Sequence, residues 1–436
     1  MSTVERLTMG PKSHFIGFHD VVPWNTSETH LLCVEAEENA PRGLASSVGV
    51  IDLSGRARSF IPLANTTAWT WHVGARQQWI ENDTFLYNAE RDGQYVAIFY
   101  DMSGGTQKEV DGGIWDITED GRWALVQSLA RSDRYYSTYG FPGGTAPSLE
   151  DPAPADDGLY LIDVTNNRRK LRFSVREVVD QLYRDLAKHE PKMFFWITHP
   201  SFNTDGTRFC FFLRHYRYDG SLHSDLFVAE RDDGPARCLL RGLVSHFDWL
   251  NADTLLIYAR RMASIDALRD MNLVKHPLIS RGLDLAKRLK KALPRRRGSA
   301  RAGGHLMVNV STGKIDIFAP DLLVVDSHQQ FTADKAWMIC DTYPGQDRNQ
   351  ELFIFDMKAY RRIELGNFPE AERLLGGPAP AVLHQGGEAV RACNLHPRWN
   401  RSGTAVCFDW ANETDRQIYA IDVSEHVQDR TAPHRP

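Results

Sequence analysis

Four histidines stand at the same place in a repeated sequence pattern. His199, His246, His328 and His396 each lie three residues before an aromatic residue, and a polar turn and an apolar run follow. Neutral imidazoles that meet at one place bind borderline divalent ions such as Mn²⁺, Zn²⁺ or Fe²⁺. A single histidine of this kind is more often a buried side chain with a backbone partner. Four in one register indicate a shared site.

Polar side chains near these histidines extend the candidate metal site. Asp326 and Asn394 each lie two residues before one of the histidines. We therefore expect the metal ligands to come from among His199, His246, His328 and His396, together with Asp326 and Asn394 beside them. A metal with an open coordination position can bind a substrate oxygen. Not all four imidazoles need to be ligands, because one of them could instead act as a general base.

Arginine and tyrosine side chains are further candidates for this site. Arg76 takes the place of the histidine in the second repeat, and Arg76 or Arg391 would pair with a substrate carboxylate. Tyr216 or Tyr343, which follow later apolar runs, would protonate a leaving oxygen. Tryptophans and tyrosines at strand ends suit a sugar ring, but they also pack one repeat against the next.

Short strands in a repeat must position these residues. A polar turn followed by an apolar strand occurs seven times, and a second strand that mostly ends in Asp or Asn follows each one. The seven segments cover residues 25–35, 81–88, 118–127, 203–213, 250–259, 332–341 and 400–410. Four antiparallel strands per repeat, with an irregular period of roughly 40 to 80 residues, are typical of a β-propeller. We therefore predict an all-β, seven-bladed β-propeller in which equivalent residues face one central channel.

The repeat predicts a single domain over residues 1–427 and a polar tail at 428–436. Three insertions interrupt it: a Gly- and Pro-rich loop at 135–157, a helical segment at 175–189 and a long segment at 262–302. The last contains a basic run at 287–297. We interpret this run as a solvated loop, with contact to an anionic surface as the alternative.

Composition limits the partners. The net charge of -5 and the pI near 6.4 give no reason to expect nucleic acid as a partner. The sequence contains no run of 18 apolar residues and no leader-like start, so we expect no transmembrane segment and a cytoplasmic protein. Its six cysteines include no C-x-x-C pair, which favours reduced, buried thiols.

The histidine-bearing turns resemble those of a known family. Thr198-His199-Pro200, Ser245-His246, Ser327-His328 and Leu395-His396-Pro397 resemble the corresponding blades of the oligogalacturonate lyases, which are cytoplasmic seven-bladed propellers. The wider pattern of His-Pro, an aromatic residue and Asp-Gly is similar to the TolB-type propeller repeat.

This resemblance implies β-elimination in an oligomeric uronate. A histidine would remove the proton α to the carboxylate, while a bound divalent metal, usually manganese, neutralises the acid. The resemblance gives His199 the position of the base and His246 and His396 positions of metal ligands. Arg391 and Asn394 stand where the family has its remaining ligands, so His328 or Asp326 would complete the metal site.

The sequence thus predicts a metal-assisted carbohydrate-active enzyme, a lyase that acts on an acidic oligosaccharide or polysaccharide. The carboxylate charge has to be neutralised before the α-proton becomes acidic, and a metal or an arginine can do this. Two alternatives stay open. One is a non-catalytic TolB-like propeller that binds a glycan or a protein, and the other is a metal-dependent hydrolase that uses the same site.

Overall fold

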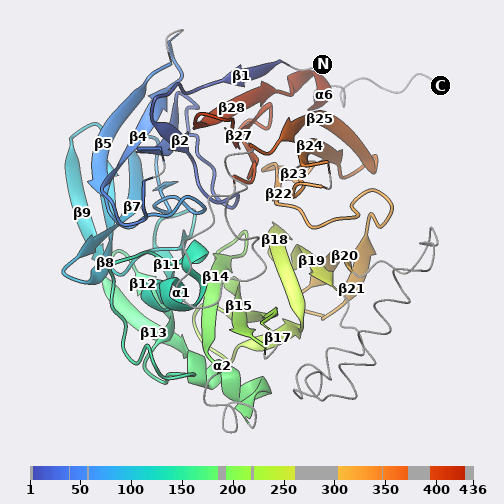
Figure 1. Ribbon diagram of the computed structural model, residues 1–436. Helices are drawn as coiled ribbons and strands as arrows, with labels where there is room; N and C mark the ends of the chain where they lie inside the picture. The colour runs from blue at the N-terminus through green and yellow to red at the C-terminus, as the bar shows by residue number, and fades with distance from the viewer. Residues whose placement is uncertain are drawn as a thin grey trace.

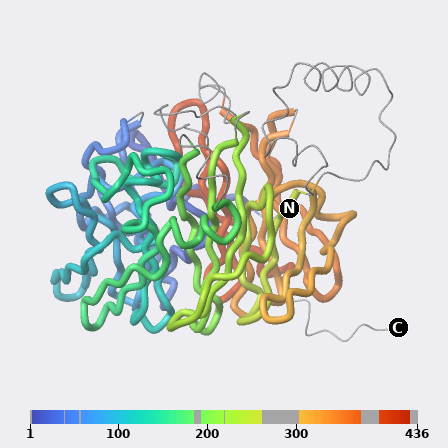
Figure 2. Tube along the Cα trace, turned by 90° about the horizontal axis from the view of Figure 1, so that it is seen from below, coloured from blue at the N-terminus to red at the C-terminus, as the bar shows by residue number. Residues whose placement is uncertain are grey.

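The computed structural model describes residues 3–38, 40–55, 58–184, 193–217, 220–260, 303–345, 347–371 and 393–427. Groups of strands follow one another around a common centre, from the blue N-terminal strands to the red C-terminal ones (Figure 1). Seen edge-on, the groups stand side by side in a broad disc (Figure 2). The predicted β-propeller class is confirmed. The predicted insertion at 262–302, with its basic run, and the tail at 428–436 lie outside the described residues.

Five of the sheets have four strands each. Their strands are β2 (Ser13–Phe15), β3 (His30–Ala36), β4 (Ser46–Asp52) and β5 (Phe60–Thr66); β6 (Gln78–Trp79), β7 (Thr84–Arg91), β8 (Gln94–Asp101) and β9 (Thr106–Asp111); β10 (Asp116–Ile117), β11 (Trp123–Gln127), β12 (Gly158–Asp163) and β13 (Arg168–Ser174); β22 (Gln329–Phe331), β23 (Trp337–Asp341), β24 (Asn349–Asp356) and β25 (Arg361–Pro369); and β26 (Arg398–Trp399), β27 (Ala405–Ala411) and β28 (Arg416–Asp422) with β1 (Val4–Arg6).

The sixth sheet consists of two four-stranded groups. Its strands are β14 (Phe195–Phe202), β15 (Arg208–Tyr216), β16 (Leu222–Glu230), β17 (Arg237–Leu240), β18 (Leu243–Asn251), β19 (Thr254–Arg260), β20 (Gly303–Asn309) and β21 (Ile315–Phe318). One parallel pair, Ser224 with Leu243, joins the two groups. We count each four-stranded group of the described chain as one blade, and we number the blades in chain order from β2.

The repeated polar turns have a physical reason. In three blades an asparagine before the turn accepts a hydrogen bond from the backbone N–H five residues later: Asn25 from His30, Asn203 from Arg208 and Asn400 from Ala405, at 2.9 to 3.0 Å. The side-chain oxygen thereby pairs a backbone donor at the start of the next strand. This is why the same turn recurs in the sequence.

The core lies between the blades. Seven buried clusters each combine apolar residues of two neighbouring blades. In one of them, Leu31 and Cys33 of the first blade pack with Cys407 and Ile418 of the last, so the interfaces continue around the whole ring. Strand β1 closes this ring because it pairs with β28, Glu5 opposite Ala420.

Helices are few among the described residues. The predicted helix at 175–189 contains α2 (Val175–Leu182), which begins with Ser174 Oγ accepting a hydrogen bond from the Glu177 N–H at 3.1 Å. The predicted loop at 135–157 begins inside a helix, because α1 (Leu129–Tyr136) extends into it and η1 (Ser137–Tyr139) lies within it. The short helix α6 (Ser424–Val427) ends the described chain. No helix of the described chain is long and apolar enough to cross a membrane.

Candidate functional site

Six histidine rings surround the phenyl ring of Phe18 at the centre of the propeller. Their centroids lie 4.4 to 6.4 Å from the Phe18 centroid, and they belong to His19, His72, His199, His246, His328 and His396. The four histidines predicted from the sequence register therefore converge. His19 and His72, from the first two blades, join them.

Three of these rings form a continuous line, which we call the histidine row: His246, His328 and His396. Neighbouring centroids in the row are 4.3 and 4.4 Å apart. His19 lies 5.1 Å from His328, and His72 lies 4.6 Å from His396. His199 contacts the row indirectly, through Phe18 and through Tyr139 and His72.

Each imidazole of the row has one nitrogen held by an oxygen. Nδ1 of His246 lies 3.0 Å from Asp326, Nδ1 of His328 lies 2.8 Å from Asp341, and Nδ1 of His396 lies 2.8 Å from the Gly17 carbonyl. These oxygens accept hydrogen bonds, so Nδ1 carries the proton and the Nε2 lone pair is left available. Metal-binding histidines usually have this arrangement.

Two of the Nε2 atoms have a common neighbour. The Tyr343 hydroxyl lies 3.2 Å from Nε2 of His246 and 3.3 Å from Nε2 of His328. Nε2 of His396 is buried and has no hydrogen-bond partner among the described residues. A ligand bound to the first two imidazoles would therefore take the place of the Tyr343 hydroxyl.

Asp341 organises two members of the row. One oxygen accepts the backbone N–H of His328 at 2.9 Å, and the other accepts the backbone N–H of His396 at 3.1 Å. The carboxylate is fully buried at the end of β23. Burial raises the pKa of Asp341 to about 7, against the effect of these two hydrogen bonds.

The local backbone explains why the histidines turn inward. A β-bulge in β14 contains His199, and another in β18 contains His246, and bulges re-aim side chains. His199 and His396 have φ angles of +55° and +44°, a conformation that is strained for these residues. Arg76, at the equivalent place in the second blade, has a φ of +53°. Such strain is typical of functional sites.

Burial keeps most of the imidazoles neutral. It is the largest cause that holds the pKa of His199, His328 and His396 well below the usual value, and the nearby positive groups add to it. Burial has the same effect on the pKa of His19 and His72. Neutral imidazoles are the form that can bind a metal.

A loop of the first blade carries Phe18 into this cluster. Arg398 donates hydrogen bonds to the carbonyl oxygens of Gly17 and Phe18, the second at 3.0 Å. Gly17 has a φ of +107°, and a Cβ there would lie 2.5 Å from the backbone of Val73. A residue with a side chain would therefore prevent the loop from entering so deeply.

The other predicted residues lie in different places. Arg76 is buried, and it donates hydrogen bonds to Asp20 and the Trp115 carbonyl. Few of its N–H groups therefore remain for a substrate. The Tyr216 ring lies 5.4 Å from Trp196, among rings that belong to β14 and α1. Asn394 is buried two residues before His396. Arg391 lies outside the described residues.

The residues near the row are of types that bind divalent ions, but their described positions do not form a metal site. In the described part of the chain, no group of three or more His, Cys, Asp or Glu side chains is arranged to hold a metal. The Nε2 atoms of the row, whose lone pairs remain available because the Nδ1 atoms are anchored, are the donors such an ion would use.

A cavity opens beside the row. It has a volume of about 500 Å³, and its lining includes Asp326, Tyr343, Val325, Arg260 and Arg362. Tyr343 and Val325 are 40% and 47% exposed, so apolar surface faces this cavity. Although the residue is partly exposed, the hydroxyl of Tyr343 lies among buried histidines. Burial and nearby carboxylates hold its pKa well above the usual value.

The sequence assigned no catalytic or metal-binding role to four groups of this site: Phe18, His19, His72 and Asp341. The first three belong to loops of the first two blades, which do not carry the register of the later blades. Asp341 ends an apolar strand, as many aspartates do at blade turns. A signal existed for His19 and His72, because both are histidines in the segments that precede an apolar strand.

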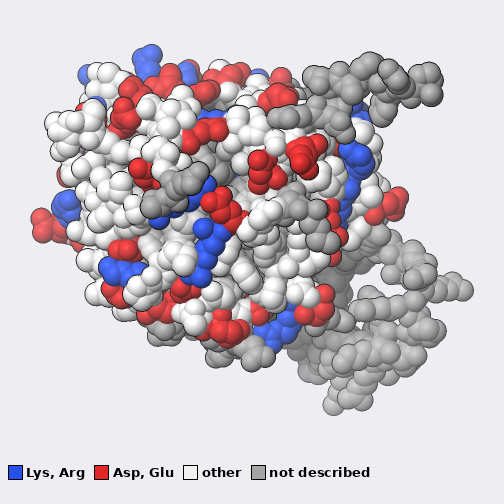
Figure 3. Space-filling model, turned by 90° about the horizontal axis from the view of Figure 1, so that it is seen from above, with Lys and Arg blue, Asp and Glu red and all other residues white. Residues whose placement is uncertain are grey.

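Charge on the outside of the ring is mixed. On the side seen in Figure 3, Lys and Arg side chains lie interspersed with Asp and Glu among the described residues. The described ion pairs on the surface include Arg58 with Glu5, at 2.7 Å.

Comparison with known proteins identifies similar folds. No family model matches this sequence, and no curated protein matches it. The structure of an oligogalacturonate lyase in complex with manganese is similar with a TM-score of 0.62 and 12% identity, over 98% of this chain and 94% of that chain. An oligogalacturonate lyase from Vibrio parahaemolyticus has a TM-score of 0.59 and 11% identity over the same shares.

A more distant likeness concerns TolB. The TolB structure from Acinetobacter baumannii aligns over 77% of this chain with a TM-score of 0.37, which is too low to support an argument. The identities of 11 to 12% limit all three comparisons to the fold. The chain is therefore a β-propeller whose fold, over nearly its whole length, is similar to that of the oligogalacturonate lyases.

Proposed function

We propose that this propeller is a metal-assisted lyase that cleaves a uronate-containing oligosaccharide by β-elimination. The observation that supports the proposal most is the histidine row, in which all three Nδ1 atoms are anchored by oxygens and the Nε2 atoms of His246 and His328 share the Tyr343 hydroxyl as a neighbour. A structural role alone would not require three imidazoles side by side, since buried polar groups cost free energy.

The row would hold the ion through His246, His328 and His396, with His19 beside them. Manganese is the first candidate because the similar lyase structure contains it. When bound, such an ion neutralises a carboxylate and so makes the neighbouring C–H bond more acidic. Arg260, at the rim of the adjoining cavity, would contact the same carboxylate.

The remaining steps are proton transfers by residues of the chain. His199 would accept the proton α to the carboxylate, and its low pKa keeps the imidazole unprotonated and ready to do so. Tyr343 would donate its phenolic proton to the leaving oxygen as the C–O bond breaks and the C=C bond forms. Phe18 contacts both His199 and the row, so it has to move before a sugar ring can contact both.

The first test combines elemental analysis with an assay for the conjugated, unsaturated product by ultraviolet absorbance. We expect bound divalent metal in the purified protein and new absorbance with oligouronates. His328→Ala should remove the metal, because it deletes the middle imidazole of the row. His199→Ala should keep the metal and lower the rate by about 10²- to 10⁴-fold, the usual contribution of a general base.

A matched control is His30→Ala, at the start of β3, which should change neither metal content nor rate. The proposal would be wrong if the protein bound no metal and produced no chromophore from any oligouronate. Metal binding with cleavage but without the chromophore would instead indicate the hydrolase.

A further inference from the structure

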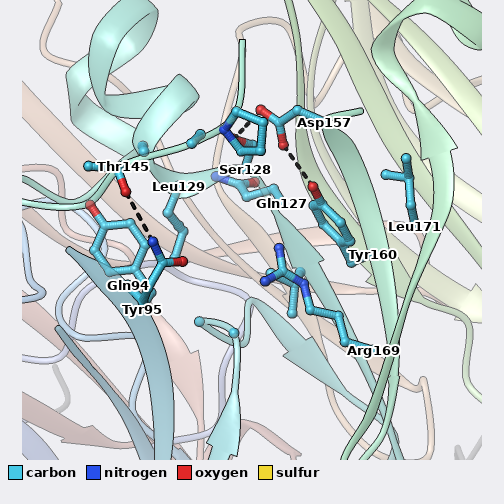
Figure 4. Close-up of a pocket in the computed structure, with 16 residues that line it drawn as sticks. Gln94, Tyr95, Gln127, Ser128, Leu129, Thr145, Asp157, Tyr160, Arg169 and Leu171 are labelled. Atoms are coloured by element: carbon cyan, nitrogen blue, oxygen red, sulfur yellow. Dashed lines mark hydrogen bonds between the residues drawn. The ribbon is translucent and has the colours of Figure 1, made fainter. Parts of the chain in front are cut away.

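A second pocket lies between the second and third blades, away from the histidine row. It has a volume of about 350 Å³ and is lined by residues of β8, β12, β13 and the start of α1. Figure 4 shows Tyr95 and Gln94 on one wall, Tyr160 and Leu171 on the other, and the Arg169 side chain directed between them. Pockets for small molecules usually measure about 300 to 1,000 Å³. This one is therefore large enough for a single small ring.

The hydroxyl groups of this pocket are turned so that their oxygens can accept hydrogen bonds. Asp157, which is 1% exposed, accepts hydrogen bonds from Ser128 Oγ at 2.6 Å, the Tyr160 hydroxyl at 3.2 Å and the Gly158 N–H at 2.8 Å. The protons of Ser128 and Tyr160 are thus directed to Asp157, and their lone pairs remain for a ligand.

Gln94 adds a third acceptor of the same kind. Its Nε2 donates to Thr145 Oγ1 at 3.0 Å, which leaves the amide oxygen available. A ligand that satisfies three acceptors has to bring several donors, as a polyhydroxylated ring does.

Arg169 gives the pocket a positive charge. Its guanidinium carbon lies 3.8 Å from the centroid of the Tyr160 ring. It forms no ion pair with any residue that the structure describes. Asp157 and Tyr160 line the same pocket. A guanidinium that stacks on an aromatic ring and has free N–H groups is suited to bind a carboxylate or a phosphate.

We infer that this pocket binds a single hydroxyl-rich ring that carries one anionic group. The acidic group would contact Arg169, and its hydroxyls would donate to Ser128, Tyr160 and Gln94. One lining residue contacts the candidate active site, because Gln127 accepts the backbone N–H of His199 at 2.9 Å. The inference does not depend on the proposed lyase activity.

Calorimetric titration of the full chain tests this inference with three probes: glucuronate, glucose 6-phosphate and uncharged glucose. We expect binding of one or both anionic sugars at millimolar or lower concentration, and at least tenfold weaker binding of glucose. Whichever anionic sugar binds more tightly identifies carboxylate or phosphate as the natural group. Absence of binding by both anionic sugars, or equal affinity for glucose, would overturn the inference.

Variants locate the binding. Arg169→Ala should weaken the binding of the anionic sugars about tenfold or more, because it removes the charge-assisted hydrogen bonds. Arg168→Ala, on the adjacent residue of β13, is the matched control and should bind like the native protein. Ala146→Leu should fill the pocket and abolish binding without removing a charge. Unchanged affinity in both Arg169→Ala and Ala146→Leu would place the ligand elsewhere.

Discussion

Three buried carboxylates hold neighbouring groups of this protein in place by hydrogen bonds. Asp116, Asp157 and Asp341 all have a pKa raised by burial, and each accepts hydrogen bonds from backbone or hydroxyl donors. These hydrogen bonds favour the charged form, while burial disfavours it. Each carboxylate therefore positions a neighbouring group at a cost in stability that depends on pH.

Asp116 should make the stability of the protein depend on pH. It accepts the Phe202 N–H at 2.7 Å, and burial raises its pKa from 3.8 to about 7. Between these values the folded protein holds a proton that the unfolded chain releases, so stability decreases as pH rises. One proton corresponds to about 1.4 kcal/mol per pH unit. Asp116→Asn should therefore make the free energy of unfolding depend less on pH, by up to this slope. The difference should be largest between about pH 4.5 and about pH 6.5, in the middle of that window.

Urea denaturation of the native protein and the variant at several pH values measures the difference. The amide keeps an oxygen for the Phe202 N–H, so the fold should persist. Parallel stability curves for the two proteins would contradict the prediction.

Strand ends and bulges are the elements that build the candidate site. His199 and His246 lie in bulges of the innermost strands, while Asp341 ends β23 and contacts the segments that carry His328 and His396. One strand end therefore fixes two histidines from two different blades. The row depends on this carboxylate for its geometry.

Asp341→Asn tests that dependence. An amide can accept at only one of its two polar atoms, so one backbone N–H would lose its partner, at a cost of about 1–3 kcal/mol. We expect the fold to persist and the bound divalent metal to decrease at least tenfold, which is the usual effect of losing a group that orients a metal ligand. Metal content and circular dichroism measure the two effects.

Asp356→Asn in the neighbouring strand is the matched control. Asp356 accepts the N–H groups of Lys358 and Ala359 at 2.9 Å in a turn at the end of β24. This variant should lose a similar amount of stability but no metal. A loss of metal in both variants would assign the effect to stability alone.

The whole molecule is a ring whose interfaces continue from each blade to the next. The first strand in the chain completes the last blade, because Val4, Glu5 and Arg6 pair with Ile421, Ala420 and Tyr419. Arg6 also forms an ion pair with Asp415 at 2.9 Å. The chain thus joins its two ends in one sheet, and the blades at the closure support each other.

Removal of residues 1–6 should open this closure. We expect a loss of about 1–3 kcal/mol, since a few ladder hydrogen bonds contribute about 0.5–1.5 kcal/mol each. Thermal unfolding measures it as a lower midpoint. Arg6→Ala in the full chain, which removes the ion pair but keeps the strand, should cost no more than about 1 kcal/mol. Equal stability of the truncated and native proteins would show that β1 is dispensable.

The sequence by itself determined the repeat, its polar turns and the register of His199, His246, His328 and His396. These features are local: each asparagine pairs a backbone N–H five residues away, and each strand alternates within its own blade. Local interactions leave a pattern in the sequence that can be recognised without the fold.

Only the tertiary structure decided what surrounds these histidines. Phe18 and His19 enter the cluster from the first blade, and His19 contacts the Gln329 carbonyl 310 residues away. Arg76, which the register placed at the site, instead donates hydrogen bonds to Asp20 and the Trp115 carbonyl. These contacts depend on which blades become neighbours after the ring closes, and residues so far apart in the chain carry no shared pattern.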